Sequence, residues 1–290
     1  MKRILVTGAK GQLGMEIRAL KEKLQGLEFI FTDIEELDIT NKIEVKKIIR
    51  SIKPHLLINC AAYTAVDRAE KDEENAFAVN ATAVKNIIDA AALAPGMKLI
   101  HISTDFVFNG KSKKPYDEDD LPLPLSVYGR SKRKGEEYAL IYPGSMIIRT
   151  SWLYSEYGGN FVKTILRLAG ERDEINVVND QTGTPTLAAD LAAAILNICR
   201  QIIFKEKTFL PGIYHYCNEG RCSWYEFACE IKRLKNLEIK LRPVSTPEFP
   251  LPAKRPSYSV LSLDKIKNTY DIEIPSWQES LEIFLNRYKP

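Results

Sequence analysis

A phenol and an ammonium group stand in the sequence at a spacing that suits acid–base chemistry. Tyr128 and Lys132 are four residues apart at the predicted start of a helix, so both side chains fall on one helix face. A phenol with a pKa of about 10 exchanges protons slowly at neutral pH unless a nearby cation favours its anion, and Lys132 supplies that cation. The pair predicts a proton donor for carbonyl reduction.

Thr104 adds a hydroxyl to this pair. It follows the apolar segment Leu99–Ser103, at the carboxyl edge where an open α/β sheet binds its ligands, and Asp105 comes next. The hydroxyl can hydrogen-bond a carbonyl oxygen and hold it between a hydride donor and the phenol. The alternative is a solvated Tyr–Lys pair and a threonine that merely ends a strand.

A glycine-rich turn near the start of the chain favours the functional interpretation. Gly8, Gly11 and Gly14 follow the apolar strand residues Ile4–Val6 directly and open an amphipathic helix. Glycine permits the sharp turn, admits a pyrophosphate and lets the helix pack on the strand, while the helix N-terminus supplies amide donors. A tight turn without a ligand is the alternative. Gly8 and Gly11 are the candidates for contact with the pyrophosphate, and Lys10, Gln12 and Leu13 lie beside them.

The cofactor choice depends on the end of the second predicted strand. Asp33 can accept hydrogen bonds from an adenosine ribose there, which favours NAD. Lys10 can instead meet a 2′-phosphate, so both NADH and NADPH stay open. Two residues of the following loop are placed to approach the adenine, and three at the end of the third strand to lie along the cofactor: Asp38 and Ile39, then Ala61, Ala62 and Tyr63.

The elements that position these residues form a regular pattern in the first half of the chain. Short β-branched runs alternate with longer amphipathic segments, which is typical of βαβ units with a parallel sheet covered on both faces. We therefore predict an α/β fold with a Rossmann-like, doubly wound domain over residues 1–150. Its expected strands are Arg3–Thr7, Phe29–Thr32, Leu56–Cys60, Leu99–Ser103 and Met146–Thr150, and its helices are Gln12–Leu24, Ile43–Ile52, Glu73–Ala94 and Tyr128–Ile141.

The alternation ends after Thr150, and prolines crowd the stretch Pro243–Pro256, which regular doubly wound structure does not tolerate. Residues 151–290 are predicted to form a smaller α/β substrate-binding domain, with some segments returning to the first domain. Its expected helices are Asn160–Leu168, Thr186–Cys199, Ser223–Leu234, Leu263–Tyr270 and Trp277–Tyr288.

Composition limits the partners and the compartment. The 41 Lys and Arg against 38 Asp and Glu are spread along the chain, so nucleic acid is not an expected partner. The five Cys form no C-x-x-C pair, which indicates reduced thiols. The longest apolar stretch, Leu187–Cys199, contains Asp190 and is too short to span a bilayer, and the first strand starts too early for a signal peptide. We expect a cytoplasmic protein that does not enter membranes.

The glycine turn, Thr104 and the Tyr-x-x-x-Lys pair together resemble the extended short-chain dehydrogenase/reductase superfamily. A more specific resemblance, to the dTDP-4-dehydrorhamnose reductase family, spans nearly the whole chain. It rests on the stretches Thr64–Asp67, Ser103–Phe108, Val127–Gly129, Arg149–Trp152 and Asn179–Pro185, together with Arg255-Pro256.

This resemblance implies an activity and roles for the residues. The activity is NAD(P)H-dependent reduction of dTDP-4-dehydro-L-rhamnose to dTDP-L-rhamnose, with Tyr128 as proton donor, Lys132 binding the nicotinamide ribose and tuning Tyr128, and Thr104 assisting the carbonyl. The positions that match cofactor contacts are Gly11, Gln12, Leu13, Asp33, Asp38, Ile39, Ala61, Ala62, Tyr63 and Asn80. The other residues predicted to lie at the cofactor are Gly8, Lys10, Gly14, Ser103, Tyr128 and Lys132. Those assigned to the nucleotide sugar are Val66, Thr104, Asp105, Trp152 and Arg255.

Two substrate assignments also have a physical basis in the residues. Trp152 can lie against the apolar face of a hexose, and the Arg255 guanidinium can bind a diphosphate in bidentate fashion. The alternatives are a core tryptophan and a surface arginine.

Metal and assembly follow from the same comparison. Family members can form an acidic Mg²⁺ site at a dimer contact, but Met15 replaces the acidic residue expected on the first helix. His215, Cys217, Cys222 and Cys229 fit no zinc-ligand spacing. We expect a homodimer and assign no metal ligand.

Two other functions share these features. A nucleotide-sugar epimerase or dehydratase has the same turn and Tyr–Lys pair, and it keeps its nucleotide bound through the catalytic cycle. The regulatory subunit of methionine adenosyltransferase resembles this family but acts by binding a partner enzyme; the intact Thr104, Tyr128 and Lys132 count against it.

Overall fold

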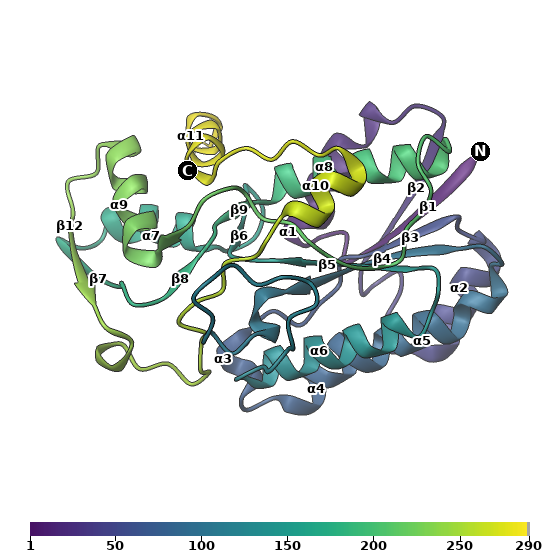
Figure 1. Cartoon of the computed structure of the whole chain (residues 1–290), viewed down its shortest axis with the longest axis horizontal. Helices are drawn as coiled ribbons and strands as arrows, with labels where there is room; N and C mark the ends of the chain where they lie inside the picture. Colours follow the sequence, from purple (N-terminus) through teal and green to yellow (C-terminus); the bar gives the residue numbers. More distant parts are fainter. Residues whose placement is uncertain (289–290) are drawn as a thin grey trace.

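The computed structural model describes residues 1–288 and is built around one parallel sheet (Figure 1). Six strands lie in the order β10-β5-β4-β3-β1-β2, and every adjacent pair runs parallel. This confirms the predicted Rossmann-like, doubly wound sheet. The strands are β1 (Lys2–Thr7), β2 (Leu27–Thr32), β3 (Leu56–Asn59), β4 (Lys98–Thr104), β5 (Ser145–Thr150) and β10 (Gly212–His215).

Helices cover both faces of the sheet because its central strands are apolar on both sides. In β1, Leu5 packs into one apolar core, while Ile4 and Val6 belong to the other. Figure 1 shows the two helical layers on opposite sides of the strands. One layer contains α2 (Lys42–Ile52), α5 (Ala83–Ala90) and α6 (Val127–Leu140), and the other contains α1 (Gln12–Leu20), α8 (Ala188–Ile203) and α10 (Asp264–Tyr270).

The predicted helix Glu73–Ala94 is interrupted in the structure. It consists of α4 (Glu73–Phe77), a π-helical turn (Ala78–Thr82) and α5, followed by a 3₁₀ turn. The π turn contains Asn80, whose side chain is buried and bonded to two other segments. Local periodicity could not reveal this turn, because the bonds that it serves are to residues distant in sequence.

The chain beyond Thr150 builds a second apolar core as well as part of the first. A parallel pair, β7 (Glu174–Val178) and β12 (Lys240–Val244), packs with three helices around this second core. The helices are α7 (Phe161–Ala169), α9 (Trp224–Lys235) and α11 (Trp277–Arg287). Four two-residue strands complete the region: β6 (Leu153–Tyr154), β8 (Thr182–Gly183), β9 (Thr186–Leu187) and β11 (Cys222–Ser223). The short helix α3 (Val66–Ala69) belongs to the first half of the chain.

The proline-rich stretch is more regular at its start than predicted. Pro243 lies within β12, which the sequence did not predict as a strand. Because β12 pairs with a single neighbour, one of its edges is free and a proline without an N–H is tolerated there. The last strand of the large sheet, β10, ends at His215, two residues before Cys217.

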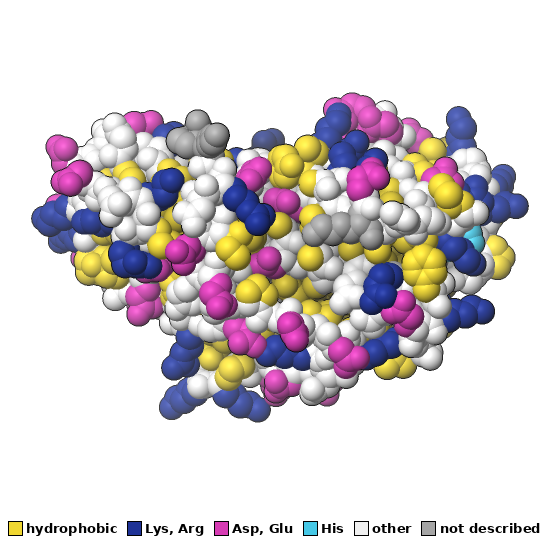
Figure 2. Space-filling view, turned by 90° about the horizontal axis from the view of Figure 1, so that it is seen from above, with side chains coloured by type: hydrophobic (Ala, Val, Ile, Leu, Met, Phe, Trp, Pro, Cys, Tyr) yellow, Lys and Arg dark blue, Asp and Glu magenta, His cyan; other side chains and the backbone are white. Residues whose placement is uncertain are grey.

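Charge is distributed rather than segregated on the visible surface. Figure 2 shows acidic and basic side chains interspersed over one face of the molecule. Within residues 1–288, no helix combines the length and the apolar character that crossing a bilayer requires.

Glu16 gives a stability test for the interface between α1 and the second half of the chain. Its residue is 8% exposed. Burial, with the nearby charges of Glu156 and Asp190, raises its pKa to about 7. When the pKa of a carboxyl is higher in the folded protein than its unfolded value of 4.5, the folded state loses stability as the pH rises from the unfolded pKa to the folded pKa. We expect Glu16→Gln to raise Tm at pH 8 and to raise it much less at pH 5, where most of the folded-state carboxyl is still protonated.

The control for this test is Glu22→Gln, because the Glu22 side chain is 87% exposed. Thermal unfolding at both pH values is the measurement. An equal change in Tm at pH 5 and pH 8 would contradict the assignment to ionisation of Glu16.

Candidate active site

The glycine-rich turn joins β1 to α1 at the carboxyl edge of the sheet. Gly8 has a φ of +67°, and a Cβ there would lie 2.5 Å from the backbone nitrogen of Ala61. A Cβ on Gly14 would lie 2.4 Å from the carbonyl oxygen of Gly8. Both glycines are therefore required by the packing of the protein itself.

Gly11 differs from these two glycines. A Cβ there would meet only the Gly8 carbonyl oxygen, at 3.3 Å, so internal packing requires glycine less strictly. Gly11 is also the N-cap of α1 and has no side chain to bond the first amides of the helix. Open amides at a helix N-terminus with a bare backbone beside them fit the pyrophosphate of a dinucleotide.

Asp33 lies next to this turn, as predicted. One carboxylate oxygen accepts the Lys10 amide at 2.7 Å, and the other accepts the Ile34 amide at 2.9 Å. The Lys10 ammonium pairs with Glu35 at 2.7 Å on the surface. Asp33 thus connects the glycine turn to the end of β2. The Lys10 ammonium, which could meet a 2′-phosphate, is paired with the Glu35 carboxylate instead.

The loop after β3 is held in place by Asn80. The Asn80 side chain accepts the Tyr63 amide at 2.9 Å and donates to the Tyr63 carbonyl at 3.1 Å. Its amide nitrogen also donates to Ser131 on α6, at 2.9 Å. Asn80 therefore fixes the predicted cofactor segment Ala61–Tyr63 relative to the helix that carries Tyr128 and Lys132.

The start of α6 is anchored on three sides. Ser126 caps the helix by accepting the Gly129 amide at 3.1 Å, and Glu70 accepts the Val127 amide at 2.8 Å. A Cβ on Gly129 would lie 2.3 Å from the Phe106 carbonyl oxygen, so α6 touches the backbone that follows β4. This contact brings Tyr128 next to Thr104.

The Tyr128 phenol lies beside Thr104 and Asp105 in a buried cluster. Tyr128 is 9% exposed, and its ring packs edge-on against Phe106 with centroids 5.6 Å apart. Burial raises the pKa of Tyr128 to about 12; the hydrogen bond with the Thr104 hydroxyl opposes this rise, and the Asp105 charge adds to it. At neutral pH the phenol is protonated and ready to donate.

Asp105 is buried, and no Lys or Arg of residues 1–288 forms an ion pair with it. Its Oδ1 accepts the Thr104 hydroxyl at 3.0 Å, and its Oδ2 has no hydrogen-bond partner among residues 1–288. Burial raises the pKa of Asp105 to about 6, while the nearby hydroxyls of Ser259 and Thr104 oppose the rise. Asp105 thus orients the Thr104 hydroxyl and places a titratable group behind it.

Lys132 lies one turn below Tyr128 and is 2% exposed. Its ammonium donates to the Ile102 carbonyl at 2.6 Å. Burial lowers the pKa of Lys132 to about 8, although Glu136 and Cys60 act in the opposite direction. The sequence predicts that Lys132 lowers the pKa of Tyr128; here the ammonium is directed to the backbone of β4.

The residues predicted to bind the sugar are engaged in protein contacts. The Trp152 ring stacks on Trp224 with centroids 3.5 Å apart, and Gly183 leaves room for its edge, since a Cβ there would lie 2.5 Å from the ring. Arg255 makes a bidentate pair with Asp67, at 3.0 and 2.7 Å. This pair lowers the pKa of Asp67 and fastens the proline-rich segment to α3.

The remaining candidates lie around the same edge of the sheet. Gln12 accepts hydrogen bonds from Ser155 and Asn160 of the second half of the chain, at 3.3 and 3.2 Å. The Asp38 carboxylate accepts the amide and hydroxyl of Thr40. The others pack into apolar cores or bury their polar group: Leu13, Ile39, Val66 and Ser103.

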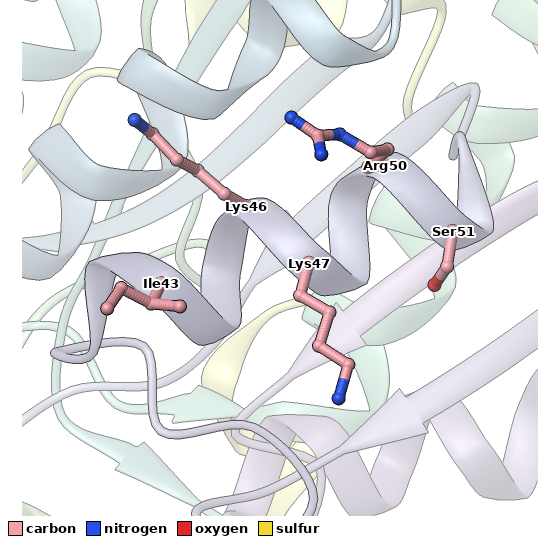
Figure 3. A pocket seen from close by; sticks show the side chains of 5 residues that line it. All are labelled: Ile43, Lys46, Lys47, Arg50 and Ser51. Atoms are coloured by element: carbon pink, nitrogen blue, oxygen red, sulfur yellow. The ribbon is translucent and has the colours of Figure 1, made fainter.

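A surface hollow elsewhere is not the candidate site. Its lining residues all come from the single helix α2, and Figure 3 shows their side chains spreading away from the helix in different directions. They bring no convergent polar groups together: Ile43, Lys46, Lys47, Arg50 and Ser51.

Fold and site define a Rossmann-type reductase of the extended short-chain dehydrogenase/reductase class. A family model described as "RmlD substrate binding domain" matches residues 1–289. The dTDP-4-dehydrorhamnose reductase of Aggregatibacter actinomycetemcomitans is 43% identical, with 97% of this chain and 98% of that protein covered. The chain belongs to the dTDP-4-dehydrorhamnose reductase family.

Solved structures of relatives have the same fold. The dTDP-4-dehydrorhamnose reductase of Bacillus anthracis, in complex with NADP, is 43% identical, with a TM-score of 0.92 and coverage of 99% of this chain and 100% of that one. The dTDP-4-dehydrorhamnose reductase of Clostridium acetobutylicum is 44% identical, with a TM-score of 0.90 and 98% of each chain covered.

Several residues that build the site were missed by sequence reasoning. Asp67, Glu136 and Arg149 bind other site residues through buried or half-buried ion pairs. Asp67 and Arg149 lie in stretches that carried the family resemblance, but their partners are distant in sequence. Glu136 has a local signal, because it lies four residues after Lys132 and on the same face of α6.

The two glycines Gly11 and Gly14 give a matched test of the turn. Gly14→Ala places a Cβ against backbone, so we expect a fall in Tm. Gly11→Ala should fold with a Tm near that of the unaltered protein but bind NADPH about tenfold or more weakly, because the added methyl obstructs the ligand. Thermal unfolding and fluorescence titration with NADPH are the measurements. Unchanged NADPH affinity in Gly11→Ala would exclude this turn as the pyrophosphate site.

Proposed function

We propose that this protein reduces the 4-keto group of dTDP-4-dehydro-L-rhamnose to give dTDP-L-rhamnose, using NADPH or NADH. The observation that carries the proposal is the buried cluster of Tyr128, Thr104 and Lys132 at the carboxyl edge of the sheet, next to the glycine turn. The family relationship over nearly the full chain supports the substrate.

The cofactor residues fit a dinucleotide. The turn at Gly8–Gly14 and the open start of α1 would hold the pyrophosphate, and Asp33 would approach the adenosine ribose. A reduced nicotinamide, when bound, supplies the hydride. The relative that binds NADP supports use of a nicotinamide dinucleotide, and the carboxylates around Lys10 leave the choice between NADH and NADPH to measurement.

The protein's own groups handle the proton and the carbonyl oxygen. The Thr104 hydroxyl would hydrogen-bond the substrate carbonyl, and Tyr128 would give its phenolic proton to the oxygen as the alcohol forms. The Lys132 ammonium would bind the nicotinamide ribose and stabilise the phenolate that Tyr128 leaves. Because burial holds the pKa of Tyr128 at about 12, that phenolate needs a cation to form readily.

The substrate side is assigned to the second half of the chain, residues 151–290. Trp152 would lie against the sugar ring, with Val66 and Asp105 nearby, and Arg255 would bind the diphosphate after exchanging its partner Asp67. The domain boundary at residue 150, the homodimer and the cytoplasmic location stay predictions from the sequence.

The direct test incubates the purified protein with dTDP-4-dehydro-6-deoxyhexose isomers and NADPH or NADH. We expect the absorbance of the reduced nicotinamide to fall when dTDP-4-dehydro-L-rhamnose is the isomer added, with dTDP-L-rhamnose as the product. Oxidised nucleotide that copurifies tightly, with isomerisation or dehydration of the sugar, would favour an epimerase or dehydratase. Cofactor binding without any turnover would exclude the reductase proposal.

Tyr128→Phe tests the proton donor. The ring keeps its place against Phe106, so the fold and NADPH affinity should be unchanged, while kcat falls by roughly 100-fold or more because the acid is lost. Steady-state kinetics and NADPH titration are the measurements. Tyr138→Phe is the control, since Tyr138 lies on the same helix outside the site. A kcat equal to that of the unaltered protein would remove Tyr128 from the mechanism.

The pH dependence of turnover tests Lys132. Its pKa is lowered to about 8, so the ammonium is present below that pH and lost above it. The phenol of Tyr128 stays protonated throughout this range, because its pKa is raised to about 12. We expect kcat/KM to fall as the pH rises through about 8. The range from pH 6 to pH 10 brackets the Lys132 pKa of about 8 and stays below the Tyr128 pKa of about 12. A flat profile of kcat/KM over this range would show that turnover needs no group that titrates near pH 8.

A further inference from the structure

Three side chains on α6 lie at intervals of four residues and share one buried face. Tyr128, Lys132 and Glu136 are 9%, 2% and 0% exposed. The first two belong to the proposed reaction, while Glu136 has no part in it. A carboxylate that is completely removed from water in the interface between α6 and the sheet needs a physical reason.

Glu136 binds two strands of the sheet and a neighbour on its own helix. Its Oε1 accepts the Ser103 hydroxyl of β4 at 2.7 Å and the Arg149 Nε of β5 at 2.8 Å. Its Oε2 accepts the Arg149 Nη2 at 2.8 Å and the Nη1 of Arg133 at 3.1 Å. The bidentate geometry fixes the direction of the guanidinium as well as its distance.

Arg149 is held from its other side by β10 and the loop after β4. Its Nη1 lies 3.4 Å from the His215 Nε2, and its guanidinium carbon lies 5.0 Å from the centre of the Phe108 ring. Burial and the Arg149 charge lower the pKa of His215 to about 3, so the imidazole is neutral and its Nε2 accepts the guanidinium proton. Polar contacts thus run from β10 through β5 to α6 and β4.

Such a pair is a costly way to stabilise a fold. Removing two charges from water costs several kcal/mol per ion, and apolar residues of similar volume often give equal or greater stability. The geometry, however, joins the two parts that the reaction must align. Ser103 directly precedes Thr104, and Glu136 is one helical turn from Lys132.

We propose that Glu136 is a positioning residue for this reaction: it holds the α6 face that carries Tyr128 and Lys132 against Thr104 and places a negative charge one turn from the Lys132 ammonium. The inference rests on the function proposed above and adds a residue to it.

The electrostatic part depends on which groups face Lys132. They are Cys60 at the end of β3, His101 on β4 and Glu136 on α6. Burial raises the pKa of the Cys60 thiol to about 12, and burial with the Lys132 charge lowers that of His101 well below its usual range. Both are neutral at physiological pH. Glu136 is therefore the charged one of these three groups, and its pKa is lowered by Arg149, Ser103 and Arg133 against the effect of burial.

The test is Glu136→Gln, which keeps the shape and the hydrogen-bonding oxygen but removes the charge. We expect kcat at pH 7 to fall about tenfold or more with little change in the KM for the sugar, because alignment and not sugar binding is lost. We also expect the alkaline fall of kcat/KM to move about one unit lower in pH, because Lys132 loses its proton more easily. Steady-state kinetics between pH 6 and pH 10 measure both, because this range brackets the Lys132 pKa of about 8.

The matched control is Glu137→Gln, since Glu137 is the neighbouring carboxylate on α6 and its side chain is 44% exposed. It should retain the kcat and the pH profile of the unaltered protein. A folded Glu136→Gln variant with an unchanged pH profile and unchanged kcat would overturn the proposal. A lower Tm with unchanged kinetics would show a purely structural role and would overturn it as well.

A second variant decides the matter if Glu136→Gln fails to fold. The double substitution Glu136→Met with Arg149→Met removes both charges of the buried pair together, so neither is left buried without its partner, and Arg133 keeps its contact with Glu137. Its alkaline fall should also lie below that of the unaltered protein. A fall at the same pH would contradict the electrostatic role of Glu136.

NADPH binding separates this inference from the proposed function. The Kd for NADPH should rise as Lys132 loses its proton, and in Glu136→Gln this rise should come at lower pH. If the unaltered protein binds NADPH but does not reduce the keto sugar, the proposed reaction fails, while the binding profiles still test Glu136. If reduction occurs and both profiles coincide between the variants, the Glu136 inference alone fails.

Discussion

The packing of α6 against the carboxyl ends of β4 and β5 is the constraint on which the site depends. Gly129 brings the helix backbone close to Phe106, and the buried pair of Glu136 and Arg149 links the same helix to the sheet about two turns further on. Tyr128 is adjacent to the first contact, and Lys132 lies between the two contacts. A small shift of α6 on the sheet would therefore move the Tyr128 phenol relative to Thr104.

Burial sets the chemistry of the site as well as its shape. The pKa of Tyr128 is raised to about 12, that of Asp105 is raised to about 6 and that of Lys132 is lowered to about 8, each chiefly because the charged form is poorly solvated. A protonated phenol, a cation below it and an oriented hydroxyl are what a ketone reduction needs from the protein. The low local polarity that makes these groups effective also makes each of them dependent on a precise partner.

The second half of the chain is bound to the first through polar contacts at the mouth of the site. Gln12 in the glycine turn accepts hydrogen bonds from Ser155 and Asn160, and Arg255 pairs with Asp67. Gln12, expected to meet a dinucleotide, and Arg255, expected to meet a nucleotide sugar, thus each already bind residues of the other half of the chain.

Much of this arrangement was readable from the sequence. Continuous apolar runs, glycines at fixed spacing and the Tyr-x-x-x-Lys pair are local patterns, and they predicted the parallel sheet, the turn before α1 and the helix that carries Tyr128. Tertiary structure decided what local patterns cannot express: the π turn that lets Asn80 reach Tyr63, the stacking of Trp152 on Trp224, and the ion pairs of Arg255 with Asp67 and of Arg149 with Glu136. Each joins residues far apart in the chain. Their energies arise from desolvation and geometry that exist only once the elements have packed.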